Sequence, residues 1–338
     1  MRFSTLLLLL LAALALSICV GDVTITPQQA IEALMHSGGT GGSSATAEQA
    51  AAVSEIVWQV RLPRVLIALV VGVGLSVSGY ILQSLSRNSL ADPYLTGVSS
   101  GAGLSVALAM LAGIDFAFIP MAAFAGGLAA STVVAVMART PAGLSVSRLL
   151  LSGVGLSAIC AAVITMVIIN SQSVWQGQGL FFWLAGGIAG RTWSEVAPAA
   201  LYTGVGTVGA LLMGKQMRLL SLGPSSAQAL GLNVARTQWT LLAWAVLMCG
   251  AAVSVSGLVG FVGLIAPHLA RRLFGRDERL HVICAALIGM LLVLLSDLAA
   301  RTLGGGQELP LGTLLSLIGG PFFLWLVARH RPEGIGHD

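Results

Sequence analysis

Asp297 and Arg301 are the first residues whose types and spacing could do chemistry, because they lie in and beside a long apolar run. Residues four apart share one face of a helix, so the carboxylate and the guanidinium could form an ion pair. A carboxylate inside a membrane-spanning helix is also a candidate proton or ion site. The sequence leaves two interpretations open: a structural pair, or the proton site of a secondary transporter.

A serine motif, Gly97-Val98-Ser99-Ser100-Gly101, fits the G-x-S-x-G pattern that in hydrolases places the serine on a tight strand-to-helix turn. No strand-like segment precedes it, and small residues also allow membrane helices to pack closely. A hydrolase would need a histidine base, and His268 and His281 lie near predicted cytoplasmic ends of helices. We therefore favour packing and predict no catalytic residue, with an intramembrane hydrolase built on Ser99 as an alternative.

A second motif, GALLMGKQ over residues 209–216, resembles the phosphate-binding G-x-x-x-x-G-K-[ST]. Gln216 replaces the hydroxyl residue that holds magnesium, and the segment ends an apolar run instead of following a strand. We predict that this chain binds no cofactor. If ATP drives the protein, a separate chain must bind ATP and magnesium.

Composition indicates which elements must position these residues. Of the 338 residues, 56% are hydrophobic and 9% are charged, against roughly 25% charged in soluble domains. A helical crossing needs about 20 apolar residues, which leaves room for roughly ten crossings and no large soluble domain. The four cysteines form no C-x-x-C pair, so neither a metal cluster nor a disulfide framework is predicted. We predict an all-α polytopic membrane protein with a single transmembrane domain over residues 1–338.

The apolar runs set the number of spans. They cover approximately residues 4–20, 65–85, 95–137, 149–169, 196–213, 239–269, 280–295 and 311–327. Two are long enough for double crossings, which gives ten spans. The breaks are expected at Gly113-Ile114-Asp115 and at the Ser256-Gly257 region, which Pro267 follows. The first run follows Arg2 and could be a signal peptide; we favour a retained span, followed by a periplasmic loop over residues 22–60.

The basic residues test this count, because cytoplasmic loops carry an excess of positive charge. With the N-terminus inside, thirteen of the 17 fall on the cytoplasmic side. The net charge of +4 is thus explained by topology instead of nucleic acid binding. The four exceptions, predicted on the outer side, are Arg61, Arg64, Arg191 and Arg301.

Two further features concern the arrangement of the spans. The segment GLSVSG over residues 74–79 resembles AVSVSG over residues 252–257, which indicates two five-helix inverted repeats. Residues 217–237 form a long cytoplasmic segment with a predicted short helix over residues 226–230, begun by an S-x-x-Q capping box at Ser225. Residues 217–237 contain more leucines than a solvated loop requires, which indicates a docking surface for another protein.

Five ordered motifs resemble the FecCD-type permeases of bacterial ABC importers for iron chelates, haem and vitamin B12. They are WQVRLPRVLIALVVGVGLSVSGYILQSLSRNSLADPYLTGVSSGAG, SVSRLLLSGVGL, LLSLGPSSAQALGLNV, SGLVGFVGLIAPHLARRLFGRDER and LSDLAARTLGGGQELPLGTLLSLIGGPFFLWLV, and they cover nearly the whole chain beyond about Trp58. The resemblance implies a type II importer permease of the inner membrane. It would form a homodimer or pseudo-dimer with two cytoplasmic ATPase subunits and a periplasmic substrate-binding protein.

The resemblance also implies roles for particular residues. Arg61, Arg64 and Arg301 occupy the positions at which such permeases receive acidic residues of the binding protein. Ser145, Val146 and Ser147 match the cytoplasmic gate. Residues 217–237 match the ATPase-coupling region, although Pro224 and Ser225 stand where many relatives have acidic residues. The predicted coupling residues are Leu220, Leu222, Gly223, Ser225, Ser226, Ala229, Leu230 and Gly231.

Cargo identity is the least determined feature. Arg191 could line an outer vestibule that favours an anionic cargo, or could anchor a lipid headgroup. Family breadth favours an iron chelate, either a ferric siderophore or haem, over vitamin B12.

Overall fold

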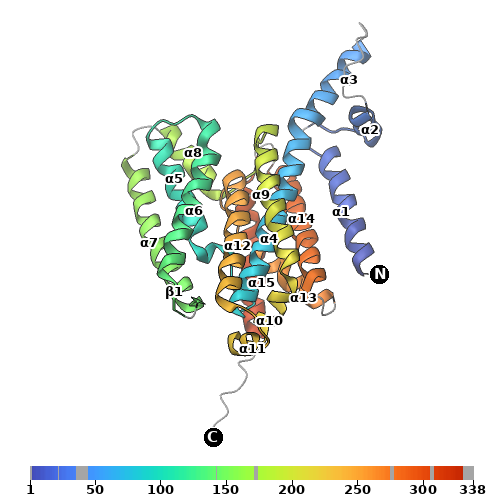
Figure 1. Ribbon diagram of the computed structural model, residues 1–338. Coiled ribbons are helices and arrows are strands. Elements are labelled where there is room, and N and C mark those ends of the chain that lie inside the picture. Colours follow the sequence, from blue (N-terminus) through green and yellow to red (C-terminus); the bar gives the residue numbers. More distant parts are fainter. Residues whose placement is uncertain are drawn as a thin grey trace.

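The computed structural model describes residues 2–21, 23–35, 45–141, 143–170, 174–274, 278–304 and 308–329. Helices dominate these residues and run roughly side by side in one bundle (Figure 1). Ten of them follow the predicted spans: α1 (Arg2–Cys19), α4 (Leu62–Ser86), α5 (Val98–Leu111), α6 (Ile119–Met137), α7 (Val146–Asn170), α9 (Trp193–Leu212), α12 (Val234–Ser256), α13 (Val262–Leu273), α14 (Glu278–Leu303) and α15 (Leu311–Arg329).

The lengths of these helices fit a membrane protein. Within the described residues, six helices are long and apolar enough to cross a membrane: those containing α4, α6, α7, α9, α12 and α14. The apolar parts of α1, α5 and α15 are shorter, and α13 is a 12-residue helix with two arginines in its last turn. The prediction of an all-α polytopic architecture is confirmed.

The predicted breaks divide the two longest runs. Gly113 adopts a left-handed conformation (φ 70°) between α5 and the 3-10 turn Phe116–Phe118 that precedes α6. Gly257 ends α12 with φ 64° and ψ −152°. A Cβ on Gly257 would lie 2.2 Å from the carbonyl oxygen of Trp183, so both conformation and space favour glycine there. Pro267, in contrast, lies inside α13.

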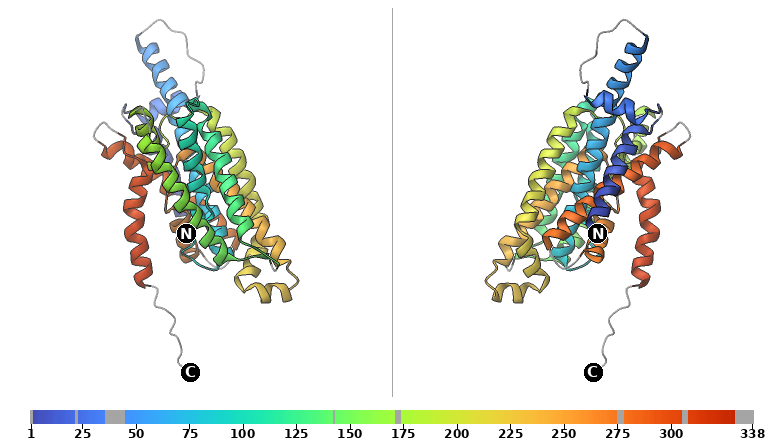
Figure 2. Two further views of the ribbon diagram at one scale, coloured as in Figure 1. Left: turned by 90° about the vertical axis from the view of Figure 1, so that its left-hand side faces the viewer. Right: turned by 90° about the vertical axis from the view of Figure 1, so that its right-hand side faces the viewer.

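Helix α4 lies at the centre of the bundle and packs against α12 and α14 (Figure 1). In the 18-residue apolar stretch of α4, 78% of the residues are buried. The corresponding share for α7, which lies at the periphery of the subunit (Figure 2), is 11%. Close approach requires glycine: a Cβ on Gly79 of α4 would lie 2.0 Å from the carbonyl oxygen of Gly263 on α13. The surface of α7 remains free for lipid or another subunit.

The ten spans form two five-helix repeats of opposite orientation, α1 with α4–α7 and α9 with α12–α15. Helices α4 and α12, which carry the matching segments, run in opposite directions and pack together (Figure 1). The segments that follow them and interrupt the α-helices, residues 87–97 and 257–261, meet inside the protein. There the Tyr94 hydroxyl donates to the Val259 carbonyl and accepts from the Val259 N–H, both at 2.9 Å. Such partners allow irregular backbone at membrane depth.

The shorter elements cap the bundle. Residues 22–60, predicted as a loop, contain α2 (Pro27–Met35), α3 (Ala45–Glu55) and the start of a π-helix (Ile56–Arg61). Helix α8 (Val174–Ala185) lies at the same end, whereas the hairpin β1 (Arg139–Thr140) and β2 (Gly143–Leu144), α10 (Gly214–Ser221) and α11 (Pro224–Ala229) lie at the opposite end (Figure 1). The 3-10 turn Pro93–Thr96 precedes α5.

The short helix predicted over residues 226–230 exists, but its capping box does not. Helix α11 begins at Pro224 after the N-cap Gly223, and no side chain caps it. Proline is preorganised for the first helical position, and Gly223 adopts φ 102°, so the chain enters the helix before Ser225.

Candidate functional site

The two ends of the bundle differ in chemistry. We call the end with α2, α3 and α8 the Arg64 end, because it carries Arg61, Arg64, Arg191 and Arg301, which were predicted on the outer side. We call the other end, with α10, α11 and the β-hairpin, the α11 end; it was predicted to be cytoplasmic. The helix directions place all four arginines at one end, as predicted (Figure 1).

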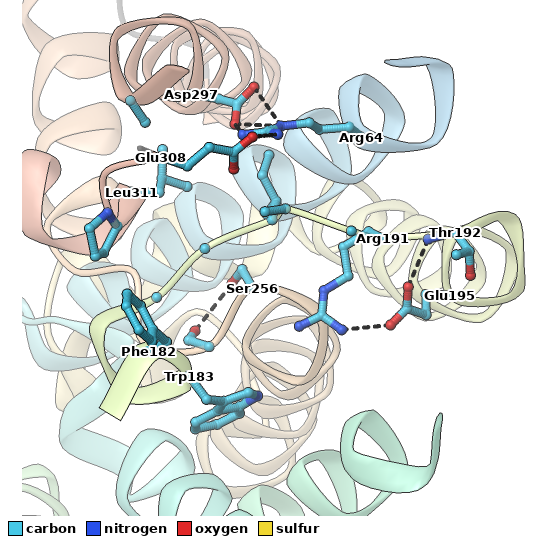
Figure 3. Close-up of a pocket in the computed structure, with 18 of the residues that line it drawn as sticks. Arg64, Phe182, Trp183, Arg191, Thr192, Glu195, Ser256, Asp297, Glu308 and Leu311 are labelled. Carbon is cyan, nitrogen blue, oxygen red and sulfur yellow. Dashed lines mark hydrogen bonds and ion pairs between the residues drawn. The ribbon is translucent and has the colours of Figure 1, made fainter. Parts of the chain in front are cut away.

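Asp297 is the centre of a buried ion network at the Arg64 end (Figure 3). Arg64 approaches it side-on: Nη2 lies 2.9 Å and Nε 3.0 Å from Oδ1. Arg301, one turn along α14, places Nη2 3.1 Å from Oδ2. The ion pair of Asp297 with Arg301, one of the two interpretations that the sequence left open, is present. The second arginine, from α4, was not predicted, and Asp297 itself is only 1% exposed.

Arg61 and Arg301 hold the end of α1. Arg61 donates to the carbonyls of Ile18 and Val23, and Arg301 donates to Ser17 Oγ (2.8 Å) and to the Val20 carbonyl (3.0 Å). The last carbonyls of a helix have no partner within the helix and favour cationic donors. These two arginines therefore attach α1 to the bundle.

Arg64 has one further partner, Glu308, in the segment before α15. Its Nη1 lies 2.6 Å from Glu308 Oε1, and the Glu308 side chain is 40% exposed. Sequence reasoning missed Glu308, although an isolated acidic residue between the last two spans was an available signal. Arg61, Arg64 and Arg301 are the predicted docking arginines. Among the ion pairs described for them, the Arg64–Glu308 pair is the one whose carboxylate-bearing side chain is exposed to solvent. The docking role itself stays a prediction.

A cavity of about 670 Å³ opens beside this network. Figure 3 shows that α8, the start of α9, the end of α12 and the start of α15 surround it; its wall includes Arg64, Phe182, Trp183, Arg191, Glu195 and Glu308. Volumes of about 300–1,000 Å³ are typical of pockets for small ligands. Aromatic faces and charged groups thus meet in one hollow at the Arg64 end.

Arg191 lies in the wall of this cavity, as one of its two predicted roles requires. Its Nη1 lies 2.6 Å from Glu195 Oε1, and Glu195 also accepts the Thr192 N–H at 2.9 Å (Figure 3). The positive charge of Arg191 is therefore compensated by the carboxylate of Glu195 in the first turn of α9. This placement favours the vestibule over a lipid headgroup anchor.

The α11 end carries the predicted coupling residues on a helix–turn–helix. Leu220 is buried against the bundle, and Gly223 and Gly231 form the turns on either side of α11. Leu222 and Leu230 project into solvent, with 59% and 61% of their surfaces exposed. Ser225, Ser226 and Ala229 are exposed between them. An exposed apolar pair at the tip of a soluble segment is typical of a protein contact.

The predicted gate residues follow the β-hairpin. Ser145 and Val146 are half-buried and Ser147 is exposed at the start of α7. The hairpin is attached to α12, because the Gln238 side-chain oxygen accepts the Leu144 N–H at 3.0 Å. Helix α12 begins at Val234, inside the predicted coupling segment of residues 217–237. Gln238 therefore links the helix that follows the predicted coupling residues to the hairpin before the predicted gate, a contact that sequence reasoning did not find.

A polar cluster inside the α11 end was also missed. Arg271 of α13 lies 5.3 Å from the ring centroid of Tyr80 on α4 and donates to Gln83. The Tyr80 hydroxyl donates to Glu278, beside His281 at the start of α14. The cluster joins three helices at this end.

The serine motif serves packing. Gly101 of α5 faces α6, where a Cβ would come within 2.2 Å of Ala130 Cβ. Ser100 donates to the Gly97 carbonyl, as at an ordinary helix start. Among the described residues, no group of three or more His, Cys, Asp or Glu side chains could hold a metal ion.

Ten spans, broken helices and contrasting polar ends define a polytopic membrane transport permease. The chain belongs to the FecCD transport family, whose model matches residues 8–329. It is 41% identical over 289 residues to the hemin transport permease HmuU of Yersinia pestis, covering 83% of this chain and 85% of that protein. It is 37% identical to the vitamin B12 import permease BtuC of Vibrio cholerae, covering 82% and 84%.

Comparison with solved structures supports the same architecture. An ABC transporter of the metal-chelate type, solved in an inward-facing conformation, superimposes with a TM-score of 0.83 and 29% sequence identity. The match covers 96% of this chain and 98% of that one. The expectation of a type II importer permease, as opposed to an enzyme, is confirmed at the level of family and fold.

Proposed function

We propose that this chain is the membrane subunit of an ATP-driven importer that carries an iron chelate, a ferric siderophore or haem, from periplasm to cytoplasm. Two copies, or this chain and a paralogue, would enclose the pathway in the bacterial inner membrane. A periplasmic binding protein would dock at the Arg64 end, and two ATPase subunits would bind the α11 end. Vitamin B12 is the alternative cargo.

The observation that carries this proposal is the opposite chemistry of the two ends. The Arg64 end collects arginines and carboxylates beside a cavity, which suits contact with an acidic protein and passage of cargo. The α11 end presents Leu222 and Leu230 on a compact helix–turn–helix, which suits insertion into an apolar cleft of another protein.

Support for an iron-containing cargo comes from relatives. The hemin permease of Yersinia pestis is 41% identical to this chain. The iron(III) dicitrate permease FecC of Escherichia coli (strain K12) and the vitamin B12 permease of Vibrio cholerae are each 37% identical to it. The faces of Phe182 and Trp183 in the cavity suit a bulky cargo with apolar faces. Haem and many ferric chelates have this character.

The geometry of Asp297 argues against the proton-coupled alternative. A proton site must bind and release its proton in every cycle, whereas both oxygens of Asp297 are occupied by Arg64 and Arg301. Removing these partners would leave buried charges without compensation. Asp297 therefore serves best as a structural counter-ion.

Transport measured in proteoliposomes tests the proposal. The complete transporter, its binding protein and internal ATP should accumulate radiolabelled haem or ferric citrate, and a protonophore should not reduce the rate. Uptake by the permease alone that collapses with the proton gradient would support a secondary transporter instead. Uptake of cobalamin without uptake of either iron compound would support the alternative cargo.

A further inference from the structure

We propose that Glu308 is an intramolecular competitor for the carboxylate of the docking protein: it occupies Arg64 until docking displaces it. The inference rests on the proposed function, because it assumes that Arg64 receives an acidic partner. It assigns to Glu308 the role of setting how tightly that partner binds. It also singles out Arg64 among the three predicted docking arginines.

Asp297 prepares Arg64 for this exchange. It takes the Nε and Nη2 edge of the guanidinium, at 3.0 and 2.9 Å, and is itself buried between α4 and α14. The guanidinium is planar, so fixing one edge also fixes the direction of Nη1. Nη1 is left to a second acceptor, and Arg64 retains a partner whichever carboxylate fills that position (Figure 3).

Glu308 is the replaceable member of the network. The Glu308 side chain is 40% exposed, whereas that of Asp297 is 1% exposed, so releasing Glu308 returns its charge to water instead of leaving it buried. The pair is open to solvent at Glu308 although Arg64 is buried, so water screens it on one side. Ion pairs screened by solvent contribute about 0–1 kcal/mol. An incoming carboxylate that offers a second contact elsewhere can therefore displace it.

The other two arginines lack this freedom. Arg61 and Arg301 donate to backbone carbonyls at the end of α1 and just beyond it. Redirecting either side chain toward a partner would leave carbonyls of residues 18–23 without these donors. Docking through Arg64 requires no such change in the bundle.

Displacement of Glu308 has a local consequence at the cavity. Glu308 and Leu311 both line the wall of the cavity. Between them, the Leu309 N–H donates a hydrogen bond to the Ala300 carbonyl at 3.2 Å. The backbone is thus held while the carboxylate is released. Docking would change the charge at the cavity mouth without unfolding the segment before α15.

Three variants separate competition from simple charge repulsion. Glu308→Gln removes the charge, and Glu308→Asp keeps the charge but shortens its reach while Leu309 holds the backbone. Glu195→Gln is the matched control, because Glu195 is another carboxylate of the Arg64 end in a 2.6 Å arginine pair, but it does not contact Arg64. The measurement is the affinity of the binding protein of the same transport system for the complete transporter in nanodiscs.

The expected result is tighter docking by about two- to fivefold for both Glu308 variants, the range for release from an ion pair that solvent screens, and no change for Glu195→Gln. Tightening by Glu308→Gln alone would show repulsion and overturn the competitor role. Unchanged affinity in both Glu308 variants would also overturn it. If the binding protein does not dock to the unmodified transporter, the proposed function fails instead.

Discussion

Arg64 and Asp297 are 233 residues apart in the sequence, yet their side chains form a two-point ion pair inside the bundle, with Nη2 and Oδ1 2.9 Å apart. The pair joins α4, the central helix, to α14, and α14 in turn holds α1 through Arg301. Residues that the sequence marked as surface contacts therefore also hold the Arg64 end together. Any test of docking has to separate these two roles.

Asp297→Ala should destabilise the protein strongly. It would leave Arg64 and Arg301 largely buried without their shared counter-ion, and breaking a buried pair in this way costs about 3–5 kcal/mol. The thermal unfolding temperature in detergent should fall well below that of the unmodified protein. Glu308→Gln, which removes an exposed partner of Arg64, should change it little. Equal stability of Asp297→Ala and the unmodified protein would contradict the structural role.

Arg301→Gln should loosen α1. It removes a charged donor from the Val20 and Ser17 carbonyls, and such hydrogen bonds contribute about 1.5–3 kcal/mol. Hydrogen exchange should become faster in the last turn of α1 and in the turn after it. Arg191→Gln, which alters an arginine paired with Glu195, serves as the control. Equal exchange in both variants would show that Arg301 does not hold α1.

Gln238→Leu should separate ATP hydrolysis from transport. It leaves the buried Leu144 N–H without its acceptor, which costs about 1–3 kcal/mol, and detaches the hairpin before the gate from α12. We expect the ATPase activity of the complete transporter to continue while cargo uptake falls. Thr240→Val, which removes only a bond to Arg236 within α12, should leave both intact. Parallel loss of hydrolysis and uptake would argue against a link through Gln238.

Leu222→Asp combined with Leu230→Asp should prevent assembly with the ATPase while leaving the permease folded. Both side chains are exposed, so the change should alter stability by no more than about 0.5 kcal/mol. Co-purification of the ATPase subunits measures the effect. Lys215→Asp places a carboxylate on the neighbouring α10 and should not disrupt assembly. Retention of the ATPase by the double variant would remove the α11 end as its docking site.

The fold was predictable where the signal is local. Apolar runs of membrane length predicted ten spans, and Gly113 and Gly257 marked real breaks, because left-handed conformations favour glycine. The pair of Asp297 with Arg301 followed from helical spacing alone. The capping box at Ser225 was wrong because Gly223 and Pro224 start the helix earlier.

Contacts between distant segments could not be predicted in this way. Arg64 meets Glu308 across 244 residues, and Gln238 meets Leu144 across 94. No periodicity in the sequence encodes which helices become neighbours. The attachment of α1 by Arg61 was hidden for a further reason, since its acceptors are backbone carbonyls that carry no residue-specific signal.

Photo-crosslinking from the two ends tests the central claim, that each end of the bundle binds a different partner. A crosslinking amino acid would replace Glu308 in one variant and Leu222 in another, both exposed positions, in the complete transporter with its binding protein present. We predict that position 308 captures the binding protein and position 222 captures the ATPase. Capture of the ATPase from position 308, or of the binding protein from position 222, would contradict the account.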